Sequence, residues 1–95
     1  MKINVMPSGY VYIKDNVVKQ MRERRLSTIS NINSLFEVRV ERGKSSILIT
    51  FDDRSSGSVK KIRDGVIQIS AIGIAKAGSR LNATLLENGD LLICK

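Results

Sequence analysis

Residues 9–21 read GYVYIKDNVVKQM and residues 65–77 read GVIQISAIGIAKA, so a glycine, aliphatic residues and an isoleucine recur at an offset of 56. The matched positions are Gly9 with Gly65, Val11 with Ile67, Ile13 with Ile69, and Val18 with Ile74. A repeat of this kind determines the architecture before any single strand does. The pattern therefore predicts that the chain is built from two similar halves.

A second match extends both halves toward their C-terminal ends. Residues 35–43, LFEVRVERG, correspond to residues 81–89, LNATLLENG, at an offset of 46. Because the offset falls by ten, we expect an insertion of about ten residues in the first half, within residues 22–34, where residues 27–34 have a composition typical of a loop. A chain of 95 residues suits one domain. We therefore expect a single domain, residues 1–95, made of half-repeats 1–53 and 57–95.

The sequence of each half predicts two strands joined by a tight turn, followed by a short helix and a hairpin. Each half is thus expected to form a ββαββ unit. In the first half, strands at residues 3–5 and 10–13 flank a turn whose proline and glycine favour chain reversal. Asp15 is expected to cap a helix over residues 16–24, and Ser70 has the analogous place before a shorter second helix.

The closing hairpins are indicated by alternating apolar and polar residues. This alternation covers residues 36–40 and 47–51 in the first half, and residues 81–85 and 91–94 in the second. The dipeptide Asn88-Gly89 predicts a type I′ turn between the last two strands. Together the elements predict a mostly β protein of the α+β class.

The composition excludes several classes of protein. Hydrophobic residues make up 42% of the chain, which predicts a folded domain rather than a disordered one. The longest apolar-rich stretch, residues 66–75, is too short and too interrupted to cross a membrane, so we expect no membrane partner. Residues 1–6 do not resemble a secretory signal. We therefore expect the protein in the cytoplasm.

Catalytic and metal-binding patterns are missing from the sequence. The chain has no histidine and a single cysteine, Cys94, which excludes a disulfide within the chain, a Cys/His zinc site and a histidine-dependent triad. Cys94 ends a predicted strand, where we expect a small buried apolar residue. The adjacent carboxylates Asp52 and Asp53 precede a Ser- and Gly-containing segment and are assigned to a turn. We expect no enzyme activity, no cofactor and no metal.

Positive charge is segregated along the chain. Lys and Arg number 16 against 9 Asp and Glu, a formal charge of +7. Residues 1–34 carry +4 and residues 54–80 carry +5, whereas residues 35–53 and 81–95 each carry −1. Two basic units predict one basic face for a polyanion. The candidate phosphate contacts are Lys14, Lys19, Arg22, Arg24, Arg25, Lys60, Lys61, Arg63, Lys76 and Arg80.

Two features of this basic face have alternative interpretations. The cations at residues 22–25 are also typical of a solvated helix end, where positive charge is favoured by the helix dipole. Tyr10 and Tyr12 lie on the strand face opposite Val11, beside Lys14. They are candidate contacts to a sugar-phosphate backbone or a base, and packing at a subunit or repeat interface is the alternative.

The pattern of glycine, hydrophobic residue and isoleucine at residues 9–13 and 65–69, each followed by a short helix, resembles the AbrB/SpoVT swapped-hairpin family. Two such units in one chain resemble the arrangement of MraZ-like proteins. The resemblance implies a small β-barrel formed by interleaved hairpins. It also implies DNA binding by basic residues around the first strands and helix, here Lys14, Lys19, Arg22, Arg24 and Arg25.

The sequence thus leads to two functional hypotheses. The first is a DNA-binding transcriptional regulator that contacts phosphates through its basic face, and homodimerisation is compatible with it. The alternative is a small protein-interaction module, such as a phage-type inhibitor or adaptor, that binds an acidic surface on a partner protein.

Overall fold

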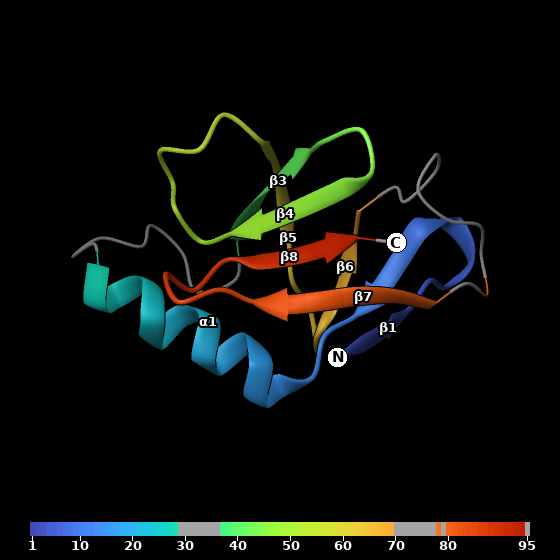
Figure 1. The fold of residues 1–95 in the computed structure, drawn as a ribbon, viewed down its shortest axis with the longest axis horizontal. Coiled ribbons are helices and arrows are strands. Elements are labelled where there is room, and N and C mark those ends of the chain that lie inside the picture. Colours follow the sequence, from blue (N-terminus) through green and yellow to red (C-terminus); the bar gives the residue numbers. More distant parts are fainter. Residues whose placement is uncertain (29–36, 70–77, 79, 95) are drawn as a thin grey trace.

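The computed structural model describes residues 1–28, 37–69, 78 and 80–94. These residues form β1 (Lys2–Asn4), the 3₁₀ turn η1 (Pro7–Gly9), β2 (Tyr10–Tyr12), α1 (Asp15–Thr28), β3 (Glu37–Arg42), β4 (Ser46–Thr50), β5 (Ser58–Lys61), β6 (Val66–Gln68), β7 (Arg80–Leu85) and β8 (Leu91–Cys94). Figure 1 shows the helix α1 lying beside the strands. The predicted class, mostly β with a helical component, is confirmed.

The described strands form two antiparallel sheets rather than a closed barrel. One sheet has six strands in the order β1-β7-β8-β4-β3-β5, and the other consists of β2 and β6. The edge strands β1 and β5 meet the smaller sheet only through the single bridges Val5↔Val11 and Arg63↔Val66. The chain reverses within a few residues at both places, so the ladders do not continue there. The expected barrel is therefore wrong for the described residues.

The strand order is symmetric about the centre of the large sheet. Each strand from residues 1–53 has its partner in residues 57–95 at the mirrored place: β1 with β5, β3 with β7, and β4 with β8. In the small sheet, Val11 lies directly opposite Ile67, and in the large sheet Ile47 lies directly opposite Ile93. One position matched by each sequence offset, 56 and 46, thus lies opposite its counterpart at the centre of an antiparallel strand pair.

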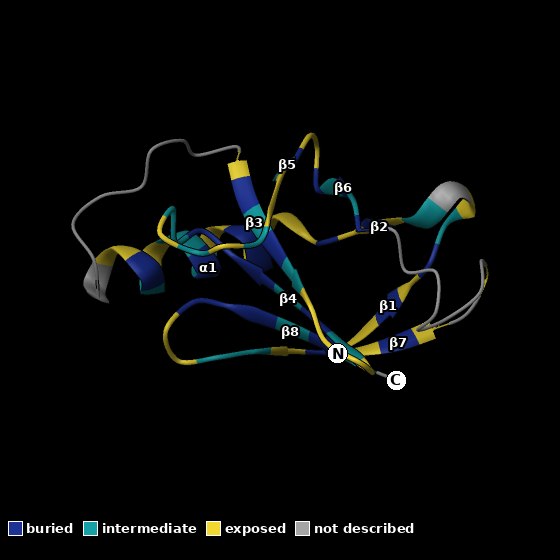
Figure 2. Cartoon of the chain, turned by 90° about the horizontal axis from the view of Figure 1, so that it is seen from above, coloured by how far each residue is buried: buried dark blue, intermediate teal, exposed yellow. Residues whose placement is uncertain are grey.

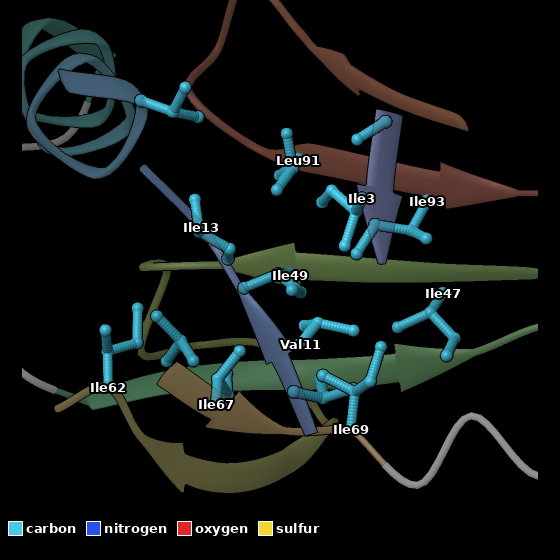
Figure 3. Packing of buried hydrophobic residues seen from close by; sticks show 14 of the residues in the cluster. Ile3, Val11, Ile13, Ile47, Ile49, Ile62, Ile67, Ile69, Leu91 and Ile93 are labelled. Carbon is cyan, nitrogen blue, oxygen red and sulfur yellow. The ribbon is translucent and has the colours of Figure 1, made fainter. Parts of the chain in front are cut away.

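The core lies between the two sheets and consists mostly of aliphatic side chains. Alternate residues of the strands point into it, as the period-two pattern predicts. Figure 3 shows Val11 and Ile67 of the small sheet packing toward Ile49 and Leu91 of the large one. These side chains are 0% exposed. Their burial removes apolar surface from water, which is the main force that holds the sheets together.

The turns differ in part from the sequence predictions. The expected hairpin of β1 and β2 is reduced to one bridge, because β1 forms its ladder with β7. A type I′ turn occurs at Asp64-Gly65, where both residues have positive φ, and not at Asn88-Gly89, where only Gly89 does. Leu86 accepts a hydrogen bond from Gly89 N and donates one to Asp90 O, which makes a three-residue loop.

Helix α1 is longer than predicted. It spans Asp15–Thr28 instead of residues 16–24, so Asp15 lies in its first turn rather than before it. The Lys14 carbonyl accepts hydrogen bonds from Val17 N and Val18 N. The helix thus extends to residue 28 within the segment 22–34 in which an insertion was expected. The expected second helix after Ser70 lies outside the described residues, as does the rest of the insertion.

No helix in the described part of the chain is long and apolar enough to cross a membrane.

Candidate nucleic-acid interface

The small sheet has one face that packs on the core and one solvent-exposed face, which we call the open face. On the core face Val11 and Ile67 are fully buried. On the open face Tyr10 is 41% exposed and Tyr12 48%. Tyr10 lies opposite Gln68 and Tyr12 opposite Val66. Because directly opposed residues project to the same side of a sheet, these four side chains share one surface.

Strand β5 and the segment that follows it add positive charge to this surface. A depression of about 410 Å³ is lined by Tyr10, Lys60, Lys61, Arg63, Val66 and Gln68. We call this depression and the adjoining Tyr12 ring the β2–β6 groove. In the view of Figure 2, β5, β6 and β2 lie along the same side of the molecule. The groove combines aromatic rings with ammonium and guanidinium groups, which suits a ligand with flat rings and anionic links.

The backbone holds the two strands of the groove at short range. Ile13 N donates to Gly65 O at 2.7 Å, and Ile69 N donates to Gly9 O at 3.0 Å. Gly65 has a φ of +78°, and a Cβ there would lie 2.4 Å from Ile13 O. Only glycine fits this position without a shift of the backbone. The groove is therefore supported by main-chain geometry rather than by flexible side chains.

Two acidic groups border the basic flank of the groove. Glu37 lies opposite Lys61 in the β3–β5 ladder, and Asp64 follows Arg63 in the turn. The three cations of the groove thus exceed the two neighbouring carboxylates. The local balance remains positive, in keeping with the net charge of +7 for the whole chain.

The structure removes Arg25 from the expected basic face. Its side chain is buried and donates to the Asp90 carboxylate and, at 3.3 Å, to Thr50 Oγ1. Asp52 Oδ2 lies 3.9 Å from Arg25 Nη1. A buried guanidinium needs carboxylate partners of this kind. Arg25 therefore joins α1 to the ends of β4 and of the β7–β8 loop, and it is not available to a polyanion.

Arg22 and Arg24 are also used by the fold. Arg24 Nη1 donates to the Leu86 carbonyl at 3.1 Å, and the Arg22 guanidinium lies over the Phe51 ring, 5.5 Å from its centroid. The β7–β8 loop approaches α1 so closely that a Cβ on Gly89 would lie 2.5 Å from Met21 O. The interpretation of residues 22–25 as a solvated helix end is therefore wrong for these arginines.

Three further predicted cations do not line the depression. Lys14, Lys19 and Arg80 are exposed, and Lys19 Nζ lies 4.0 Å from Glu23 Oε1 on the same helix. Lys76 lies outside the described residues. Of the ten predicted contacts, the groove brings together Lys60, Lys61 and Arg63, along with Tyr10 and Tyr12.

Sequence reasoning missed Val66 and Gln68 as parts of the groove. A signal for them was present, because they alternate with Ile67, which matches the core residue Val11. Residues on either side of a buried strand position face the opposite surface. What the sequence did not reveal is that β6 pairs with β2, which places both next to the tyrosines.

The carboxylates at residues 52 and 53 belong to a turn, as predicted. Asp52 Oδ1 accepts hydrogen bonds from Arg54 N at 2.9 Å and Arg54 Nε at 3.0 Å. The hydrogen bond from the Arg54 side chain is the main reason that the pKa of Asp52 lies below its ordinary value of 3.8. Among the described residues, no cluster of three or more His, Cys, Asp or Glu could hold a metal ion. Cys94 is partly exposed rather than buried.

Comparisons of this chain with protein-family models, with curated proteins and with solved structures found no match.

Proposed function

We propose that this protein binds DNA through the β2–β6 groove and acts as a small DNA-binding regulator. The observation that carries the proposal is that the groove places Lys60, Lys61 and Arg63 beside two exposed tyrosines. Lys and Arg side chains neutralise phosphates, and tyrosine contacts sugars and bases. The proposal moves the main contact from the arginines of α1 to β5 and the turn that follows it.

We also infer that the two halves of the chain are related swapped-hairpin units. Three observations support this inference: the symmetric strand order, the opposition of matched residues, and the hydrogen bonds that repeat with exchanged partners. Ile13 N donates to Gly65 O while Ile69 N donates to Gly9 O, and both pairs follow the offset of 56. In this arrangement β1 pairs with β7 and β5 pairs with β3, so each half contributes an edge strand to the other.

The test of DNA binding is fluorescence anisotropy of a labelled DNA duplex at several salt concentrations. We expect binding that weakens steeply with salt, because bound phosphates release counterions. The variant Lys61→Ala with Arg63→Ala should bind more weakly, with a slope of log affinity against log salt reduced by about 2.

The matched control is Arg42→Ala with Lys44→Ala, which also removes one arginine and one lysine. Both control residues are exposed: Arg42 is at the end of β3 farthest from the Glu37↔Lys61 pair, and Lys44 lies in the loop that follows. Equal losses in the two variants would show that only the net charge matters and would contradict a defined site. No binding of the unaltered protein to duplex or single-stranded DNA at low salt would overturn the proposed function.

A second candidate function, binding to an acidic protein surface, is favoured by Val59. This side chain is 48% exposed on the edge strand β5, between Ser58 and Lys60. An edge strand can pair with an extended segment of a partner protein, and an exposed apolar residue beside a lysine on that strand would suit a partner segment with acidic side chains. Recovery of one stoichiometric partner protein from a nuclease-treated lysate, lost in a Val59→Asp variant, would support this function over DNA binding.

A further inference from the structure

The only two tyrosines of the chain lie side by side on the open face of the small sheet. The sequence contains four aromatic residues, and Phe51 is 2% exposed whereas Tyr10 and Tyr12 are 41% and 48% exposed. Exposure of two rings at alternate positions of one strand leaves apolar surface in contact with water. A strand whose open face only had to be solvated would be expected to carry threonine or lysine there.

The spacing of the two rings suits consecutive flat ligands. Residues two apart on a strand are separated by about 6.8 Å, about twice the thickness of an aromatic ring, so each tyrosine offers its own ring surface. Each ring can therefore take a separate base. The β2–β6 ladder fixes both Cα positions, since Tyr10 pairs with Gln68 and Tyr12 with Val66.

The cations lie where a sugar-phosphate chain would run beside such bases. Lys60, Lys61 and Arg63 line the same depression as Tyr10. The ring of Tyr12 lies over the turn, because a Cβ added to Gly65 would come within 2.8 Å of Tyr12 Cε1. The two tyrosines of β2 and the three cations on and after β5 are thus neighbours. A bound nucleic acid would place its bases on β2 and its phosphates toward β5.

We propose that the β2–β6 groove binds single-stranded nucleic acid, with bases stacked on Tyr10 and Tyr12 and phosphates held by Lys60, Lys61 and Arg63. This proposal rests on the proposed function and names the form of nucleic acid. In a duplex the faces of the bases are covered by their neighbours, so exposed rings find no base to stack on. In a single strand the bases are open, and aromatic stacking strengthens binding at each base by about fivefold to a hundredfold.

The protein carries its own reporter of this stacking. It has two tyrosines and no tryptophan, so its intrinsic fluorescence comes from Tyr10 and Tyr12 alone. Stacking on a base quenches tyrosine emission, whereas contact through phosphates alone leaves it largely unchanged. The titrations use a 12-nucleotide oligo-dT, an oligo-U of the same length and a 12-base-pair duplex, with a tyrosine amide in solution as the control for absorption by the bases.

We expect at least one of the two single strands to quench the emission and to bind at least about tenfold more tightly than the duplex. Preference for oligo-dT would support DNA as the ligand, whereas binding of oligo-U without binding of oligo-dT would overturn DNA as the ligand in the proposed function. Equal or tighter binding of the duplex, or binding of the single strands without quenching, would overturn the proposal.

Variants separate stacking from charge. Anisotropy with the preferred single strand should show a loss of about tenfold or more in Tyr10→Ala with Tyr12→Ala, and a change below about threefold in Tyr10→Phe with Tyr12→Phe. Tyr10 and Tyr12 are both exposed, and an unchanged thermal transition would show that both double variants fold. Unchanged affinity of the alanine pair, alongside weaker binding of Lys61→Ala with Arg63→Ala, would overturn the stacking and leave DNA binding in place. No binding by any variant or by the unaltered protein would overturn the proposed function itself.

Discussion

Two groups of cations in this protein have opposite roles although they look alike in sequence. Arg22, Arg24 and Arg25 on α1 contact a phenyl ring, a carbonyl and a carboxylate of the protein itself. The second group, Lys60, Lys61 and Arg63, lines an open groove beside Tyr10. The difference arises from the neighbours that the fold supplies, because Asp52, Thr50 and Asp90 surround Arg25. A run of basic residues in the sequence thus does not by itself distinguish cations that the fold uses for its own contacts from cations that line an open groove.

The largest expected effect is a loss of folding stability when one of the α1 arginines is replaced. Arg25→Met should lower the free energy of unfolding by about 3–5 kcal/mol, because the buried Asp90 carboxylate loses its cation. Urea denaturation would measure this loss, with Arg42→Met as a control that removes an exposed arginine. Adding Asp90→Leu to Arg25→Met should recover part of the stability. A loss below about 1 kcal/mol in the single variant would contradict a structural role for Arg25.

The next effect concerns the loop on which α1 packs. Gly89 has a φ of +98°, and a Cβ there would lie 2.5 Å from Met21 O and 2.8 Å from Arg25 N. Gly89→Ala should cost at least about 1–3 kcal/mol from the backbone conformation alone, and the displaced helix adds to it. Thermal unfolding would measure the change, and Gly78→Ala is the control, because Gly78 also has positive φ but no atom of the described residues lies within 4 Å of its added Cβ. Equal costs would mean that the contact with α1 contributes nothing.

A smaller change in stability is expected for the groove. Lys61→Ala with Arg63→Ala should change the free energy of unfolding by less than about 0.5 kcal/mol, because both side chains are exposed. The same variant should lose affinity for nucleic acid while its stability is kept. Arg25→Met, in contrast, should lose stability. Urea denaturation and anisotropy on one protein preparation would measure both. A destabilised variant would show that these cations also belong to the fold.

The smallest effect concerns Asp52, which lies near both Arg25 and the exposed Arg54. Its pKa is lowered in the folded protein, so its ionised form stabilises the fold above the unfolded pKa, and this contribution is lost as the pH falls through the lowered folded value. Arg54→Ala should raise the pKa of Asp52 toward 3.8 and leave stability at neutral pH nearly unchanged, since Arg54 is exposed. Titration of the Asp52 carboxyl by NMR would detect the shift, and an unchanged pKa would assign the lowering to Arg25 instead.

The burial of Arg25 was partly visible in the sequence. Val17, Met21 and Arg25 follow one another at intervals of four residues, so they lie on the same face of a helix. All three are buried. The charge of Arg25 instead predicts, from the sequence alone, a phosphate contact or part of a solvated helix end. Its carboxylate partner, Asp90, stands 65 residues further along the chain, and no local pattern connects the two.

Local patterns in the sequence determined the strands of the closing hairpins, the presence and start region of the helix, the turn at Asp52, and the alternation that buries one face of each strand. These features depend on neighbours within a few residues, so periodicity and turn chemistry are enough to predict them. Only the tertiary structure decided that β1 pairs with β7, that β2 and β6 form a separate sheet, and that Arg25 meets Asp90. Such pairings depend on which distant segments bury each other's apolar faces, and that choice is made by the packing of the whole core.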